Sequence, residues 1–213
     1  MTQSLTLCGV ILAAGKSSRM GTDKALLPWP PAAQPAGSSA TQTLLSAAIA
    51  ALNPVTGKVI VVAGKNAAAL APIVSACGAF LVENPDPDRG QFSSLQTGLS
   101  AVVAGGYDAA IITPVDCPPL SAATLRQLCV AFDQALAAGK WAVAPEHQGM
   151  HGHPLVAGRQ LIHAFLSAPV TSNARAVQHA HLQAIEYVPV SDSLLSADLN
   201  TPEQYNAAAR ARS

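Results

Sequence analysis

Short apolar runs alternate with segments of helical character along this chain, and that alternation limits the possible folds more than any other feature of the sequence. Each apolar run has the length of a buried strand and ends in a polar or glycine-containing turn. We therefore predict an α/β fold: a three-layer, Rossmann-like, mostly parallel sheet with helices on both faces. The predicted strands are residues 5–12, 58–64, 79–84, 108–116 and 141–147.

The remaining segments complete this pattern without indicating a second domain. Asn66 and the serines near 93 are expected to cap helices. Residues 28–42 are rich in Pro, Ala, Gly and Ser, which predicts a flexible surface loop. With no internal repeat, residues 1–213 are predicted to form one domain. Helices are predicted over 43–52, 66–77, 93–105, 121–139, 174–181 and 201–212, and short strands over 152–158 and 184–190.

The composition narrows the expected partners and compartment. Twelve Lys plus Arg balance twelve Asp plus Glu, so we expect neither nucleic acid nor an anionic membrane as a partner. The four cysteines form no C-x-x-C pair and no zinc spacing, which favours buried free thiols in a reducing compartment. The apolar run near the amino terminus is too short to span a bilayer. We expect a cytoplasmic protein.

The stretch LAAGKSSRMGTDK over 12–24 gathers cations in a chain where only 11% of residues are charged. It follows the carboxyl end of a predicted strand, where ligands bind in open α/β sheets. Small residues allow a ligand close to the backbone, and exposed N–H groups can bind phosphate oxygens. Arg19 and Lys24 could hold a triphosphate and neutralise its leaving group. The alternative is a solvated turn with scattered cations.

Two common phosphate-binding motifs are disfavoured at this stretch. Gly15-Lys16-Ser17 supplies the end of a P-loop, but Val10 occupies the position where that motif needs its first glycine. The dinucleotide fingerprint G-x-G-x-x-G is also absent. The sequence therefore disfavours a P-loop NTPase and a Rossmann dehydrogenase.

Polar residues near two later segments are candidates for a metal site. Asp116 directly follows a predicted strand and precedes two prolines, which suits a Mg²⁺ ligand at the sheet edge. Asp198 and Asn200 are two residues apart, so both oxygens could face one metal. The alternatives are a strand-ending turn at Asp116 and N-capping before Pro202.

Two further polar groups are candidates for substrate contacts. Ser93 and Ser94, at a predicted helix start, could offer hydroxyl and N–H groups to a base or ribose, or could only cap the helix. His147, His151 and His153 lie close together, but without the H-E-x-x-H spacing of a zinc site. We predict a polar, substrate-facing loop there, with a surface loop carrying incidental histidines as the alternative.

Five motifs occur together in one order and cover nearly the whole chain. This set resembles the MobA-like nucleotidyltransferases, and within them the molybdenum cofactor cytidylyltransferases, because the first loop has Leu-Ala-Ala-Gly rather than Leu-Ala-Gly-Gly. The motifs are L-A-A-G-x-x-x-R-M-G-x-x-K-x-L-L over 12–27, R-G-Q-F-S-S-L-Q-T-G-L over 89–99, P-V-D-C-P-P-L over 114–120, G-H-P-L-V over 152–156 and D-L-N-T-P-E-Q-Y over 198–205.

The resemblance implies a mixed sheet of the nucleotide-diphospho-sugar transferase type. It also implies a nucleotidyl transfer reaction. CMP would move from CTP to the phosphate of the molybdopterin cofactor with Mg²⁺ as cofactor, pyrophosphate would leave, and a molybdoenzyme would receive the product. The implied roles are nucleotide binding by Leu12, Ala13, Ala14, Gly15, Ser94 and Asp116, catalysis by Arg19, Lys24 and Asp116, metal binding by Asp116 with Asp198 or Asn200, and pterin binding by Gly152 and His153.

Some residues depart from the family pattern. Asn200 and Gln204 stand where the family has aspartates, and His151 stands where we expect a basic residue. These departures leave open a cytidylyl- or guanylyltransferase for another phosphorylated molecule of the sugar, polyol or phospholactate type. An alternative of another class is a non-catalytic module that binds a nucleotide or cofactor.

Overall fold

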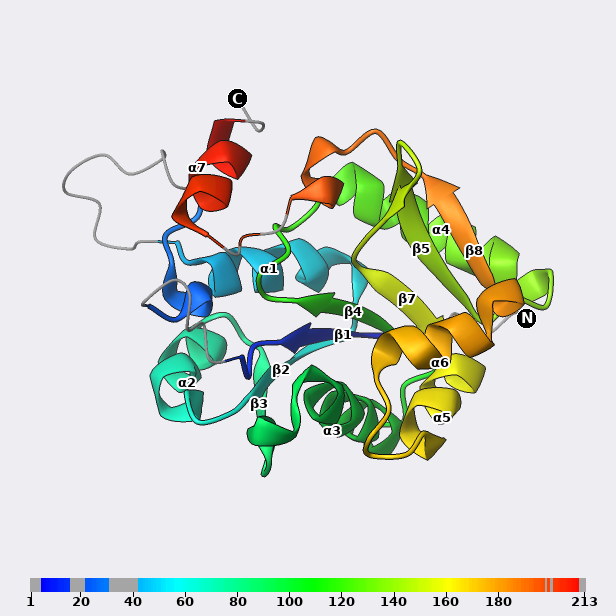
Figure 1. Cartoon of the computed structure of the whole chain (residues 1–213), viewed down its shortest axis with the longest axis horizontal. Coiled ribbons are helices and arrows are strands. Elements are labelled where there is room, and N and C mark those ends of the chain that lie inside the picture. The colour runs from blue at the N-terminus through cyan, green and yellow to red at the C-terminus, as the bar shows by residue number, and fades with distance from the viewer. Residues whose placement is uncertain (1–4, 16–21, 31–41, 198, 200, 211–213) are drawn as a thin grey trace.

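A single mixed sheet organises the molecule (Figure 1). The computed structural model describes residues 5–15, 22–30, 42–197, 199 and 201–210. Within these residues, the sheet has the order β3-β2-β1-β4-β7-β5-β6, and β8 also pairs with β5. The strands are β1 (Leu7–Leu12), β2 (Lys58–Ala63), β3 (Phe80–Glu83), β4 (Ala109–Pro114), β5 (Ala142–His147), β6 (Met150–His151), β7 (Leu155–Gly158) and β8 (Ile185–Pro189).

Most strand pairs are parallel, which confirms the predicted fold class. The first four strands run parallel to one another, and β8 runs parallel to β5. β7 is antiparallel to both β4 and β5, and it joins the two parallel parts of the sheet. In the register, Leu12 lies opposite both Val62 and Pro114, so the carboxyl ends of β1, β2 and β4 meet at one edge.

Helices cover both faces of this sheet (Figure 1). Alternate residues of a strand point to opposite faces: in β1, Ile11 packs with α1, α2 and α4, whereas Val10 and Leu12 pack with α3, α5 and α6. The helices are α1 (Leu44–Leu52), α2 (Ala67–Ala76), α3 (Gln91–Ala104), α4 (Ala122–Ala137), α5 (Arg159–Ser167), α6 (Ala174–Ala180) and α7 (Pro202–Arg210). Single-turn 3₁₀ helices are η1 (Lys24–Leu26), η2 (Asn53–Val55), η3 (Pro87–Arg89), η4 (Leu182–Ala184) and η5 (Ser193–Ser196).

Helix α3 lies especially close to the sheet because of one glycine. A Cβ atom on Gly98 would come within 2.8 Å of side-chain atoms of both Val10 and Val62. The missing side chain therefore lets the helix pack against β1 and β2 and holds its first turn near their carboxyl ends.

The starts of two helices differ from the predictions. The predicted serine cap is wrong, because Gly90, with a φ of 93°, occupies the N-cap position and α3 begins at Gln91. Helix α5 was not predicted, because it follows β7 directly and no side chain caps its start.

The predicted surface loop over 28–42 is wrong at its first residues; residues 31–41 lie outside the described part of the chain. Trp29 is 1% exposed and packs in a cluster with Leu44, from α1, and Ala208, from α7. Tyr205, also from α7, donates its hydroxyl hydrogen to the carbonyl oxygen of Pro28. An aromatic anchor therefore lies within a segment whose composition indicated only a loop.

Among the described residues, the helices are all too short or too polar to cross a lipid bilayer.

Candidate active site

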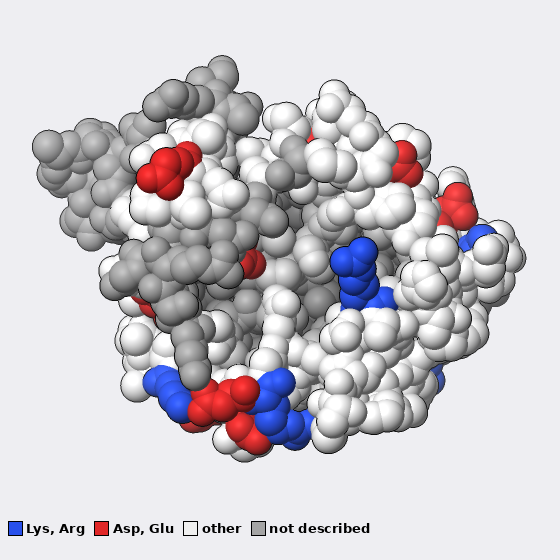
Figure 2. Space-filling model, in the orientation of Figure 1, with Lys and Arg blue, Asp and Glu red and all other residues white. Residues whose placement is uncertain are grey.

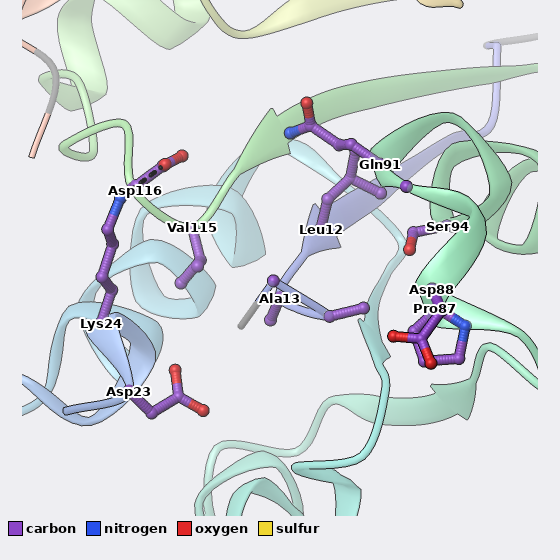
Figure 3. A pocket seen from close by; sticks show the side chains of 13 residues that line it. Leu12, Ala13, Asp23, Lys24, Pro87, Asp88, Gln91, Ser94, Val115 and Asp116 are labelled. Atoms are coloured by element: carbon purple, nitrogen blue, oxygen red, sulfur yellow. Dashed lines mark hydrogen bonds and ion pairs between the residues drawn. The ribbon is translucent and has the colours of Figure 1, made fainter. Parts of the chain in front are cut away.

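A cavity of about 450 Å³ opens at the edge where β1 and β4 end (Figure 3). Small residues of the loop after β1 line it together with charged and polar side chains. Figure 3 shows Asp23, Lys24 and Asp116 on one side and Asp88, Gln91 and Ser94 on the other. The lining residues are Leu12, Ala13, Ala14, Gly15, Asp23, Lys24, Pro87, Asp88, Gly90, Gln91, Ser94, Val115 and Asp116.

Lys24 and Asp116 form an ion pair across this edge, although 92 residues separate them in the sequence. Lys24 Nζ lies 3.1 Å from Asp116 Oδ2, and their side chains are 11% and 35% exposed. Lys24 begins η1, whereas Asp116 lies two residues after the end of β4. Because water is partly excluded, their charges act more strongly on a bound anion or cation than they would in bulk solvent.

A carboxamide holds the turn that carries Lys24. Asn66 Nδ2 donates to the carbonyl oxygen of Ala13 at 2.9 Å and to Asp23 Oδ2 at 2.6 Å, and Asn66 Oδ1 accepts from Gly64 N at 3.0 Å. Asp23 Oδ1 accepts from Ala25 N at 3.0 Å, which caps η1. Asn66 does occupy the predicted N-cap position of α2, but its side chain makes no capping hydrogen bond there.

The opposite wall is formed by the first turn of α3. Asn84 Nδ2 donates to Ser93 Oγ at 2.8 Å and to Ser94 Oγ at 3.0 Å, and all three side chains are buried. Ser93 Oγ in turn donates to the carbonyl oxygen of Gly90 at 2.8 Å. Ser94 lines the cavity as the nucleotide-binding prediction requires, whereas Ser93 is bound within the turn.

A second cavity of about 750 Å³ lies beside the first and shares Leu12, Gly90 and Gln91 with it. Gly152 and His153, the predicted substrate-binding residues, both line this second cavity. In Figure 2, the charged atoms at the rim of the central hollow are acidic on its left and basic on its right, and charges of both signs occur elsewhere on this face. The two cavities are therefore adjacent at this edge of the sheet.

The second cavity has basic and aromatic groups. Arg89 and Arg175 line it, and within the described residues neither forms an ion pair. The rings of His151 and Tyr187 stack with centroids 3.6 Å apart and also line the cavity. These groups suit a planar ring that carries an anionic tail.

The three clustered histidines do not converge on one point. His147 Nδ1 lies 2.8 Å from the carbonyl oxygen of Val190, whereas His151 Nε2 lies 3.6 Å from Glu146 Oε2. Across the described part of the chain, no three His, Cys, Asp or Glu side chains are grouped to hold a metal ion. A carboxylate such as Asp116 still suits Mg²⁺, which takes one or two protein carboxylates and completes its shell with phosphate and water.

Three of the predicted site residues, Arg19, Asp198 and Asn200, lie outside the described residues. Leu199, between the last two, is buried, and its backbone N–H donates to the carbonyl oxygen of Asp116 at 3.1 Å. The backbone at position 199 is therefore adjacent to the candidate metal ligand.

Residues 9–185 match the family model described as MobA-like NTP transferase domain. The chain belongs to the MobA-like NTP transferase family. Within this family, the chain is 33% identical over 216 residues to the molybdenum cofactor guanylyltransferase of Xanthomonas euvesicatoria pv. vesicatoria (strain 85-10), covering 97% of this chain and 96% of that protein. It is 25% identical over 198 residues to the molybdenum cofactor cytidylyltransferase of Escherichia coli (strain K12), covering 92% of each.

Solved structures share the fold. The crystal structure of Rv0371c from Mycobacterium tuberculosis H37Rv matches with a TM-score of 0.78 at 23% identity, over 99% of this chain and 100% of that one. The same protein in complex with manganese matches with a TM-score of 0.70 at 19% identity, over 96% and 98% of the two chains. The predicted family and fold are thus confirmed.

Sequence reasoning missed several residues that line the two cavities. Asp23 and Gln91 line the first, and Arg175 and Tyr187 line the second. Asn66 was assigned only a capping role. Asn66 could have been found by the argument used for Asp116, because it too is a polar residue soon after a buried strand.

Proposed function

We propose that this protein transfers CMP from CTP to the terminal phosphate of the molybdopterin cofactor and releases pyrophosphate. The observation that carries the proposal is the Lys24–Asp116 ion pair in a cavity that opens directly beside a second, basic and aromatic cavity. Family membership gives nucleotidyl transfer as the reaction class. CTP as the donor and Mg²⁺ as the metal are parts of the proposal.

The chemistry needs positioning and charge neutralisation more than proton transfer. An oxygen of the acceptor phosphate forms a bond to the α-phosphorus of CTP. The bond from that phosphorus to the bridging oxygen of the β-phosphate breaks, and the electron pair leaves with pyrophosphate. Because the attacking oxygen is already anionic, no general base is required.

Each described residue has a defined role in this proposal. Lys24 exchanges its contact with Asp116 for the β- and γ-phosphates and stabilises the charge that develops on pyrophosphate. Asp116 would hold the divalent metal, which supplies further charge neutralisation when bound; the manganese complex of the structural relative supports such a requirement. Arg19 is proposed as a second triphosphate ligand. Leu12, Ala13 and Gly15 would line the nucleotide, with Ser94 near its base or ribose.

The methyl group of Ala14 bears on which base the first cavity accepts. Ala14 lines the first cavity, and its Cβ lies 3.2 Å from the point where a Cβ on Gly64 would be. A glycine at position 14 would leave more room. We infer that Ala14 favours the smaller pyrimidine base. The relative at 33% identity is a guanylyltransferase, so GTP is the competing donor.

Gly152 and His153 would contact the acceptor in the second cavity. A planar ring would lie among the aromatic side chains, with its phosphate directed toward the boundary that the two cavities share. The product would then pass to a recipient molybdoenzyme.

Pyrophosphate release with molybdopterin as acceptor tests the proposal for each of the four nucleoside triphosphates in Mg²⁺. We expect release with CTP, and we expect Ala14→Gly to raise the rate with GTP relative to CTP. Preference of the wild-type protein for GTP would assign a guanylyltransferase instead. Thermal unfolding is an independent readout of binding, because a ligand at 100 times its Kd adds about 2.7 kcal/mol of stability. Absence of both signals with every nucleotide would favour the non-catalytic module.

A further inference from the structure

We propose that Asn66 is a positioning residue for Lys24. Its carboxamide keeps the carboxylate of Asp23 occupied, so that Lys24 presents its charge to Asp116 and to an incoming triphosphate. This inference rests on the proposed role of Lys24 as a phosphate-binding cation. It concerns a residue that is not itself among those lining the nucleotide cavity.

The orientation of the Asn66 carboxamide is fixed by its partners. Its two N–H groups donate to Ala13 O and Asp23 Oδ2, and its oxygen accepts from Gly64 N. Reversing the amide would place its oxygen against a carbonyl and a carboxylate and its N–H groups against an N–H. The three partners come from the end of β1, the end of β2 and the residue before η1, so this one side chain joins three segments.

Asp23 would otherwise compete with Asp116 for Lys24. It precedes Lys24 directly in the chain and lines the same cavity. Figure 3 shows the Lys24 side chain extending toward Asp116 while the Asp23 carboxylate points away from that pair. Both Asp23 oxygens are engaged, one by Ala25 N at 3.0 Å and the other by Asn66 Nδ2 at 2.6 Å.

The short bond to Asn66 is charge-assisted, which makes it stronger than a neutral hydrogen bond. Loss of that donor leaves an anionic oxygen in a cavity that must receive an anionic triphosphate. The freed carboxylate repels the phosphates and offers Lys24 a second partner. Removing a hydrogen bond to a charged group corresponds to about a 10- to 100-fold change in an equilibrium constant.

Calorimetric binding of CTP and CMP in Mg²⁺ separates this role from general structural support. The two nucleotides share base, ribose and α-phosphate, whereas only CTP carries the phosphates assigned to Lys24. We expect Asn66→Ala to weaken CTP binding about 10- to 100-fold and to leave CMP binding nearly unchanged. Equal weakening of both nucleotides would overturn the inference.

Two double variants sharpen the test. Asp23→Asn in the Asn66→Ala protein removes the freed charge but keeps an oxygen for Ala25 N, so we expect it to restore most of the CTP affinity. In a Lys24→Gln protein, Asn66→Ala should cause a smaller further loss, because the competition for Lys24 is gone and only the direct repulsion of the phosphates by Asp23 remains. An undiminished further loss there would count against the inference, as would a complete lack of rescue by Asp23→Asn.

Thr6→Val is the matched control. It removes a hydroxyl that donates to Asp108 at 2.8 Å, and Asp108 lies before the start of β4, at the opposite end of that strand from Asp116. We expect it to alter neither the CTP nor the CMP affinity. If Asn66→Ala does not fold, Asn66→Gln displaces the same amide by one methylene, and the same selective loss of CTP affinity is expected. An unchanged CTP-to-CMP affinity ratio in Lys24→Gln would overturn both the role of Lys24 and this inference. Selective binding without pyrophosphate release would contradict only the proposed function.

Discussion

Strand β4 has an aspartate near each end, and the two differ in what surrounds them. Asp108, before the strand, accepts from Thr6 N at 3.1 Å, Thr6 Oγ1 at 2.8 Å and Arg159 Nη2 at 2.7 Å. The backbone N–H and hydroxyl of Thr6, with a smaller contribution from Arg159, lower the pKa of Asp108. Asp116, after the strand, faces a cavity and an ion pair with Lys24 at 3.1 Å.

The comparison shows that aspartates at the two ends of one strand serve different purposes. Donors that belong to the protein surround Asp108, so its charge stabilises the fold. The oxygens of Asp116 face a space large enough for a ligand, so its charge can be used by a metal or exchanged. Burial does not separate the two, since their side chains are 32% and 35% exposed; the surroundings do.

The largest expected effect comes from replacing each aspartate by alanine. Asp116→Ala should lower pyrophosphate release by about 10³-fold, because it removes the proposed metal ligand, while the folding transition remains cooperative. Asp108→Ala should leave the rate unchanged and lower the unfolding temperature. Steady-state kinetics and thermal unfolding of both proteins measure the contrast. Near-normal activity of Asp116→Ala would contradict the proposed difference between the two aspartates.

The two cations that pair with these aspartates should differ in the same way. Lys24→Ala should reduce turnover about 10²- to 10³-fold, the typical cost of losing one preorganised group that stabilises developing charge. Arg159→Ala, at the other end of β4, should leave turnover unchanged. The assay is again pyrophosphate release, now at saturating CTP. Equal losses in the two variants would mean that position along the strand does not separate the roles.

Gly98→Ala tests the close packing of α3 against the sheet, which we expect to affect the free energy of unfolding. The added Cβ would lie 2.8 Å from both Val10 and Val62, and overpacking of this kind costs about 1–3 kcal/mol. The helical preference of alanine over glycine returns less than about 1 kcal/mol. We expect a net loss of about 1–2 kcal/mol in urea unfolding. Ser100→Ala on the exposed side of the same helix should stay within about 0.5 kcal/mol.

The smallest expected effect is a pH dependence of stability from Asp108. Its folded pKa is lowered, so its contribution is fully present above its unfolded pKa, near 4, and is lost as the pH falls through the lower folded value. Because the site is open to solvent, we expect at most about 1 kcal/mol. The difference in unfolding free energy between wild type and Asp108→Asn should therefore shrink from pH 6 to pH 2. A difference that grows over this range would contradict the sign.

The carboxyl-edge rule for parallel strands explains which site residues could be predicted. Lys24 and Asp116 follow predicted strands, and the register of β1 and β4 brings their loops together. The link from Asn66 to Asp23 could not be predicted, because a side-chain contact across 43 residues leaves no periodic signal in the sequence.

The burial of Trp29 could not be predicted from the sequence for a similar reason. Its partner Tyr205 belongs to α7, far along the chain, and their ring centroids lie 6.2 Å apart. The surrounding composition of Pro, Ala, Gly and Ser describes a loop but does not identify a single anchored side chain within it. Helix α5 was missed because the start signal used for the other helices, a capping side chain, is absent.

The boundary shared by the two cavities has a consequence for protein engineering. Leu12, Gly90 and Gln91 belong to both cavities; all residues that line the first cavity precede α4, whereas most that line the second, between 144 and 187, follow it. Helix α4 lies between these two stretches of chain. A crossover placed in α4 would therefore join the nucleotide loops of one family member to the acceptor wall of another, and a library of such chimeras could vary the acceptor while the donor stays constant.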